Sequence, residues 1–152
     1  MKVLIAVDDD AASREALAFA ERLVSDRDEV LVLNVTNYPG LVPLAGDPFG
    51  AGMGAIALDP ASLAEIDERA EQLVERSADE IDVKSEHVVE RGAPGERICA
   101  VADEHAIELI ILGSHERGAF GRFLHGSVSD YVVHHAGCPV LVVKHTKVPA
   151  SG

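Results

Sequence analysis

The chain has 152 residues, of which 47% are hydrophobic, and its formal net charge is −13. This length favours a single domain around one core, expected over 1–145 with a short tail at 146–152. The acidic balance leaves no basic patch to neutralise phosphates, which argues against nucleic acid and membrane surfaces as partners. Because no apolar run is long enough to span a membrane and no signal-peptide pattern is present, we expect a cytoplasmic protein.

Strand-like and helix-like stretches alternate from the first residues onward. A continuous apolar run at 3–7 is typical of a buried parallel strand. Helical spacing of apolar residues follows at 13–25, with Asp10 or Ser13 as the candidate N-cap. A second apolar strand is expected at 30–35, which completes a first strand–helix–strand unit.

The middle of the chain continues this alternation after one long interruption. The segment 37–59, rich in Gly and Pro, is too long for a simple connection, and a binding loop and plain disorder both remain open. Asp59 and the proline after it predict a capped helix over 60–78. A third strand is expected at 83–89, near a sheet edge, and a third helix at 94–105.

The stretch 109–143 carries the strongest signal for a binding site. An apolar run at 109–112 predicts a fourth strand, and a loop with Gly113, Gly118 and Gly126 follows it. A strand that leads through a glycine loop into a helix is a recurrent anion-binding arrangement, because free backbone N–H groups and the helix dipole point the same way.

The fourth helix and fifth strand complete this stretch. Ser127 and Asp130 have the spacing of an N-cap and its capping-box partner, so the helix is expected to begin there. Gly137 is expected in the left-handed position that ends it. The apolar run at 140–143 predicts the last strand. Together the elements predict an α/β fold, a five-stranded parallel open sheet with helices on both faces.

The glycine pattern resembles that of the universal stress protein family. The resemblance rests on Gly113-Ser114, Gly126-Ser127-Val128 and the segment 135–143, HAGCPVLVV. It implies a Rossmann-like fold of the adenine nucleotide alpha hydrolase type. It also implies ATP binding through G-x2-G-x9-G-[S/T], whose middle glycine is replaced in this chain by Glu116.

The resemblance also implies which residues surround the nucleotide. Asp8 matches the family's first-strand aspartate, and Val35 matches the residue whose backbone meets adenine. Mg²⁺ would bridge phosphate oxygens, since hard cations prefer oxygen ligands, although no metal ligands are assigned. No catalytic residue is expected, and ATP hydrolysis would at most be slow. The expected nucleotide-binding residues are Ala6, Val7, Asp8, Val35, Leu112, Gly113, Ser114, Gly118, Gly126, Ser127 and Val128.

Several alternatives remain open at this stage. Because Glu116 adds like charge and a Cβ beside the expected phosphates, the chain is alternatively a family member that binds no nucleotide and acts as a protein-interaction module. Asp8 alternatively serves only helix capping and turn formation. The resemblance implies a homodimer through the edge strand Val140–Val143, whereas the tail alternatively covers that edge. A response-regulator receiver is disfavoured, because the third strand ends without a phosphoacceptor aspartate.

The chain has two cysteines, Cys99 and Cys138. Two residues do not make a disulfide framework of the kind that holds small secreted proteins together. Each stands among apolar residues, so buried free thiols are expected.

Overall fold

The computed structural model describes residues 1–37, 59–114 and 127–145. In these ranges strands and helices alternate as expected. The elements in chain order are β1 (Lys2–Ala6), α1 (Ala11–Leu23), β2 (Glu29–Thr36), α2 (Pro60–Asp79), β3 (Ser85–Arg91), α3 (Pro94–Glu104), β4 (Leu109–Ser114), α4 (Ser127–His135) and β5 (Val140–Lys144). The predicted tail and most of the predicted long loop lie outside the described residues.

The five strands form one parallel sheet in the order β3-β2-β1-β4-β5. Ala6, at the end of the central strand β1, pairs with Leu33 of β2 on one side and with Leu112 of β4 on the other. Strand order therefore reverses beside β1, where the chain first builds toward β3 and then toward β5. The predicted fold class is confirmed, and the reversal marks where such sheets bind ligands.

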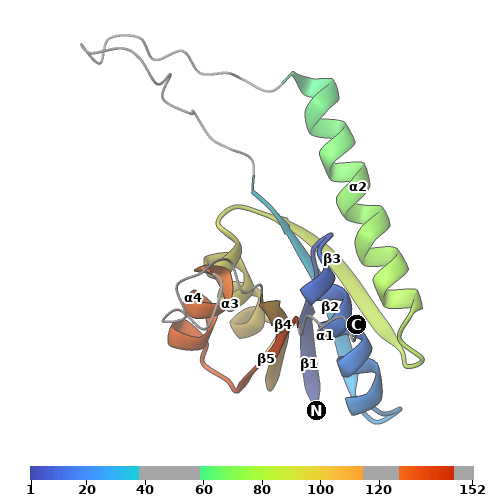
Figure 1. Cartoon of the computed structure of the whole chain (residues 1–152), viewed down its shortest axis with the longest axis vertical. Coiled ribbons are helices and arrows are strands. Elements are labelled where there is room, and N and C mark those ends of the chain that lie inside the picture. Colours follow the sequence, from blue (N-terminus) through green and yellow to red (C-terminus); the bar gives the residue numbers. More distant parts are fainter. Residues whose placement is uncertain (38–58, 115–126, 146–152) are drawn as a thin grey trace, which may run out of the picture.

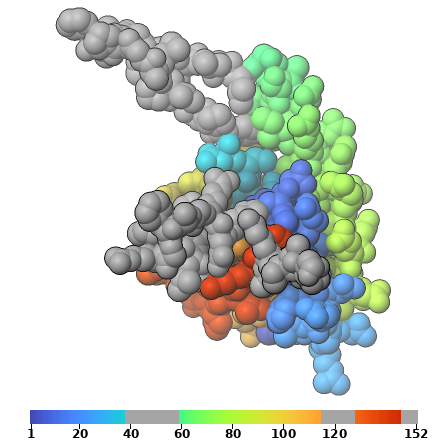
Figure 2. Space-filling view, viewed as in Figure 1, coloured from blue at the N-terminus to red at the C-terminus, as the bar shows by residue number. Residues whose placement is uncertain are grey.

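Helices cover both faces of the sheet. Figure 1 shows α1 and α2 on one side of the sheet and α3 and α4 on the other. Strand side chains alternate between the two faces, so Ile5 packs in the α1–α2 core and Leu4 in the α3–α4 core, each with 0% exposure. Figure 2 shows α2 forming a continuous side of the described surface.

Local chemistry explains where the helices begin. The Asp10 carboxylate accepts the Ser13 N–H at 2.7 Å, so Asp10 rather than Ser13 is the N-cap of α1. Asp59 caps α2 in the same way by accepting the Ser62 N–H at 2.9 Å, with proline in the first turn as predicted.

The predicted start of α4 is confirmed, whereas a prediction at its end needs correction. The helix begins at Ser127, and Asp130 lies in its first turn. Gly137 does not adopt the left-handed conformation; among the described glycines only Gly92 has a positive φ, at 135°. The chain leaves α4 through backbone that does not need glycine for its φ.

No helix in the described part of the chain combines the length and hydropathy that crossing a bilayer would require.

Candidate functional site

A pocket of about 130 Å³ opens at the carboxyl ends of the strands, on the α3–α4 side of the sheet. Its walls come from the ends of β1, β2 and β4 and from the N-terminal parts of α3 and α4. The lining residues are Ala6, Val7, Asp8, Leu33, Asn34, Val35, Pro94, Ile98, Leu112, Gly113 and Val128. The pocket therefore lies at the reversal of strand order, where the fold places ligands.

Seven of the expected site residues line this pocket: Ala6, Val7, Asp8, Val35, Leu112, Gly113 and Val128. Ser114 is buried at the end of β4, next to Gly113. The backbone of Ser127 opens α4, whereas its side chain lies outside the described part. Gly118 and Gly126 also lie outside it, as does Glu116. The pocket is smaller than the roughly 300–1,000 Å³ of typical ligand sites.

The main chain of Val35 faces the pocket. On the β1 side of β2, the Leu33 carbonyl accepts the Val7 N–H at 2.8 Å. On the β3 side, the Thr36 carbonyl accepts the Gly92 N–H at 3.0 Å. Because main-chain groups alternate along a parallel strand, the N–H and C=O of Val35 point toward the β1 side, where β1 has already ended. They present one donor and one acceptor to the opening.

Asp8 takes part in the turn between β1 and α1 and also lines the pocket. Its carboxylate accepts the Asp10 N–H at 3.0 Å, and its own N–H donates to Ser13 Oγ at 2.8 Å. The side chain remains exposed. The turn-forming role and a ligand-binding role are therefore compatible, since a carboxylate has lone pairs for more than one donor.

Gly113 is required by packing against α1. A Cβ atom at this position would lie 2.4 Å from the carbonyl carbon of Ala12 and 2.7 Å from the Ser13 nitrogen. Both neighbours are backbone, which cannot move aside as a side chain can. The glycine thus lets the first turn of α1 approach β4 closely at the rim of the pocket.

Four lining residues were not expected from the sequence: Leu33, Asn34, Pro94 and Ile98. Asn34 carried a signal, since it is the one polar residue in the apolar run 30–35. Its side-chain amide donates to the Val7 carbonyl at 2.7 Å and fastens the end of β2 to the end of β1. The other three are apolar, and only the tertiary arrangement reveals that they reach the pocket.

Two larger hollows lie elsewhere on the described surface. One of about 630 Å³ lies at the opposite end of the strands, where they begin, among side chains of both charge signs such as Lys2 and Glu29. Another of about 310 Å³ lies between α2 and the end of β2, with Arg69 and Arg76 on its wall. Neither hollow is lined by Asp8, Gly113 or Val128, which the family pattern predicts at the nucleotide site. A larger volume alone does not make either hollow the better candidate for that site.

Within the described ranges, no group of three or more His, Cys, Asp or Glu side chains is arranged to hold a metal ion. The adjacent His134 and His135 each place Nδ1 on a backbone carbonyl four residues earlier, on Asp130 and Tyr131. The described pocket thus offers main-chain donors and acceptors, apolar walls and one carboxylate, which is chemistry for binding a small molecule.

Comparison with known proteins gives the family. The model of the universal stress protein family matches residues 1–144. Universal stress protein MJ0531 of Methanocaldococcus jannaschii is 31% identical over 147 residues, covering 96% of this chain and 83% of the relative.

Solved structures share the fold. That of MJ0577, also from Methanocaldococcus jannaschii, has a TM-score of 0.74 at 24% identity and covers 96% of both chains. A universal stress protein family protein from Arabidopsis thaliana, solved with AMP bound, has a TM-score of 0.62 at 18% identity, covering 99% of this chain and 97% of the other. With the family model matching nearly the whole length, the chain belongs to the universal stress protein family.

Proposed function

We propose that this universal stress protein binds an adenine nucleotide, ATP with Mg²⁺, in the pocket beside β1 and acts as a homodimeric regulator of the stress response in the cytoplasm. The observation that carries the proposal is the main chain of Val35, which offers an N–H and a C=O to the pocket. Adenine presents a ring-nitrogen acceptor next to an amino donor, so its edge complements one such peptide unit. Apolar neighbours such as Ile98 and Leu112 would cover the ring faces.

The phosphates would lie toward α4. Val128, in the first turn of that helix, lines the pocket, so the positive end of the helix dipole lies beside it. By resemblance, Gly113, Gly126 and Ser127 would add main-chain N–H groups and a hydroxyl. Asp8 and Asp130 make these surroundings acidic, and a divalent cation would offset that charge. The AMP found in the Arabidopsis relative supports this class of ligand.

The proposal is tested by calorimetric titration of the purified protein with ATP and Mg²⁺. Asp8→Asn removes the charge that lines the pocket yet keeps an oxygen for the Asp10 N–H, so the turn should persist. We expect about tenfold weaker binding, equivalent to about 1.4 kcal/mol, because the variant loses a charge that would attract the divalent cation bound with the phosphates. The matched control is Asp9→Asn, because Asp9 is the exposed neighbour that does not line this pocket. Equal effects of both changes would contradict the placement.

A second candidate function is that of an interaction module without nucleotide, favoured by the carboxylate of Glu116 in the glycine motif. Glu116→Gly decides between the two. If the wild type binds nucleotide, this change should tighten binding, because it removes a like charge beside the expected phosphates. If the wild type fails at millimolar ATP and the variant binds, the second candidate is correct for the natural chain.

A further inference from the structure

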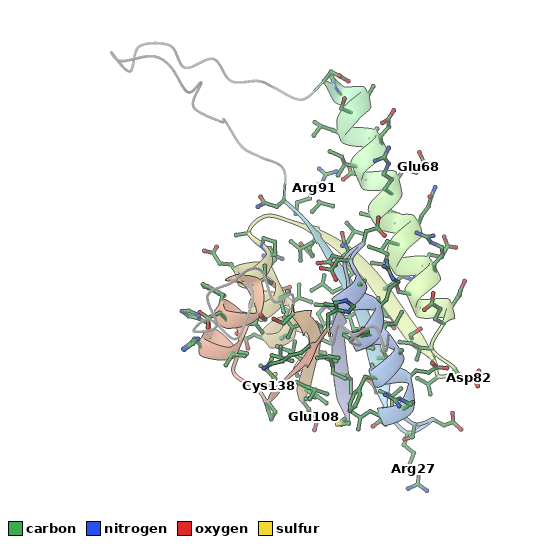
Figure 3. The ribbon with its side chains drawn as sticks, in the orientation of Figure 1. Arg27, Glu68, Asp82, Arg91, Glu108 and Cys138 are labelled. Carbon is green, nitrogen blue, oxygen red and sulfur yellow. The ribbon has the colours of Figure 1, made fainter. Side chains whose placement is uncertain are left out.

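The two cysteines of the chain lie on facing segments. Cys99 is on α3, and Cys138 lies in the turn between α4 and β5, where Figure 3 labels it. Both are half-buried free thiols, and both pack against the same α3–α4 core. The only two cysteines of the sequence thus lie in the same part of the fold.

A stripe of three positions on α3 fixes how Cys99 faces. Gly95, Cys99 and Asp103 are spaced four residues apart and therefore lie on one face of the helix. At the first position, a Cβ on Gly95 would lie 2.7 Å from the Tyr131 ring of α4. At the last, the Asp103 carboxylate lies 3.3 Å from where a Cβ on Gly137 would be. Cys99 is in the middle of this stripe and so faces the segment that contains Cys138.

The electrostatics of the two thiols agree with this placement. Burial raises the pKa of both Cys99 and Cys138, and the Asp103 carboxylate raises each further. The pKa of Cys99 is also raised by the charge of Cys138, which agrees with the facing positions of the two residues. Since the thiolate is the reactive form, both thiols are slow nucleophiles at neutral pH.

We propose that Cys99 and Cys138 close into a reversible intramolecular disulfide under sustained exposure to a peroxide. The thiolate of one cysteine attacks the peroxide O–O bond and becomes a sulfenic acid, with release of water or an alcohol. The second thiol then attacks that sulfur and expels its hydroxyl as water. Two thiols are thus oxidised and one peroxide is reduced, with no other reactant. The inference does not rest on nucleotide binding.

The cross-link would tie α3 to the approach of β5. The segment between the two cysteines contains β4, the expected glycine loop and α4. A disulfide would keep the two ends of this segment together in the unfolded chain, which stabilises the folded state. Cys99 directly follows Ile98, which lines the pocket, so the brace would also hold one wall of the site.

The test treats the full chain with hydrogen peroxide at mildly alkaline pH, where more thiolate is present, and measures intact mass without reductant. We expect the mass of two hydrogen atoms to be lost, a joined peptide containing both cysteines after digestion, and a melting temperature raised by a few degrees. A dithiol reductant should reverse all three. Cys99→Ala and Cys138→Ala should each abolish the mass loss.

Three other outcomes would overturn the proposal: oxygen atoms added to single cysteines, a disulfide between two chains, or unchanged mass after prolonged treatment. The wild-type measurement decides among them even if one alanine variant fails to fold.

Discussion

Gly113 at the end of β4 lies directly against Ala12 in the first turn of α1, so closely that a Cβ on Gly113 would come within 2.4 Å of the Ala12 carbonyl oxygen. This position is also the first glycine of the pattern that suggests phosphate binding. The contact shows that the fold needs glycine there whether or not a ligand is present. Gly113 by itself is therefore weak support for a nucleotide, whereas the open main chain of Val35 is stronger support.

Gly113→Ala should destabilise the protein by about 1–3 kcal/mol, because the added methyl group meets rigid backbone. Urea unfolding measures the change, and the slope of the transition should stay constant. The matched control is Gly137→Ala, whose methyl group would meet only the flexible tip of Asp103. That variant should lie within about 0.5 kcal/mol of the wild type. Similar costs for the two would contradict the close approach of α1.

Asn34 joins two strand ends that frame the pocket through its hydrogen bond to the Val7 carbonyl. Asn34→Ala should cost about 1–2 kcal/mol, because a buried carbonyl loses its side-chain donor. Asn34→Asp should cost more at neutral pH, since a carboxylate would face that carbonyl oxygen. In acid the Asp variant should recover relative to Ala, because a protonated carboxyl can donate again. Urea midpoints of both variants across pH test this order.

The α-amino group of Met1 forms an ion pair with Asp28 at 2.8 Å. This amine, followed by bonds from Ser25, lowers the pKa of Asp28 from 3.8 to about 2. A depressed carboxyl pKa stabilises the fold above the unfolded value and loses that contribution as pH falls from about 4 to about 2. Conversely, Asp28 raises the pKa of the Met1 amine from 8.0, so the amine stabilises below that value and its contribution fades as pH rises through the raised pKa.

Asp28→Asn should therefore flatten the dependence of stability on pH at both ends of the range. Urea midpoints measured from acid to alkaline pH would show the change. Asp26→Asn, at an exposed neighbouring carboxylate, provides the control and should keep the wild-type profile. An unchanged profile in the Asp28 variant would show that the ion pair contributes nothing measurable in solution. Acetylation of the α-amino group should reproduce the alkaline part of the change and much of the acid part, because only the bonds from Ser25 would still lower the pKa of Asp28.

Most of the fold could be predicted from the sequence, because parallel strands buried on both faces stand out as apolar runs. Val3–Ile5 and Ile110–Leu112 are such runs. The boundaries were less accurate where capping is ambiguous: α1 begins two residues earlier than expected, since Asp10 and not Ser13 accepts the capping bond. The third strand lies two residues later than expected at the sheet edge, where three of its seven residues are exposed and its pattern is mixed.

The candidate site was predictable only where residues match a family pattern or follow directly after a strand. Asp8 and Gly113 meet both conditions. Ile98 meets neither, because it reaches the pocket from α3, and its distance from β1 in the sequence hides the contact. The orientation of the Val35 main chain likewise depends on β2 running further than β1, which no local pattern reveals.

The last strand offers a test of the proposed homodimer. β5 is an edge strand, and the Ile110 N–H donates to the Pro139 carbonyl at 3.0 Å. Because main-chain groups alternate, the odd-numbered residues from 139 onward face β4, whereas the N–H of Val142 faces away from the sheet. Within the described residues that N–H takes no part in the β4–β5 ladder, so its loss would leave the ladder intact.

Val142→Pro should convert a dimer into a monomer, because proline removes this outward donor and is tolerated on edge strands. Sedimentation equilibrium measures the mass, and circular dichroism checks that the fold persists. Val142→Ile keeps the donor and a similar side chain, and should remain dimeric. If the wild type is already monomeric, or if the folded proline variant stays dimeric, the contact is not made through this edge. A monomeric, folded proline variant that still binds nucleotide would separate assembly from ligand binding.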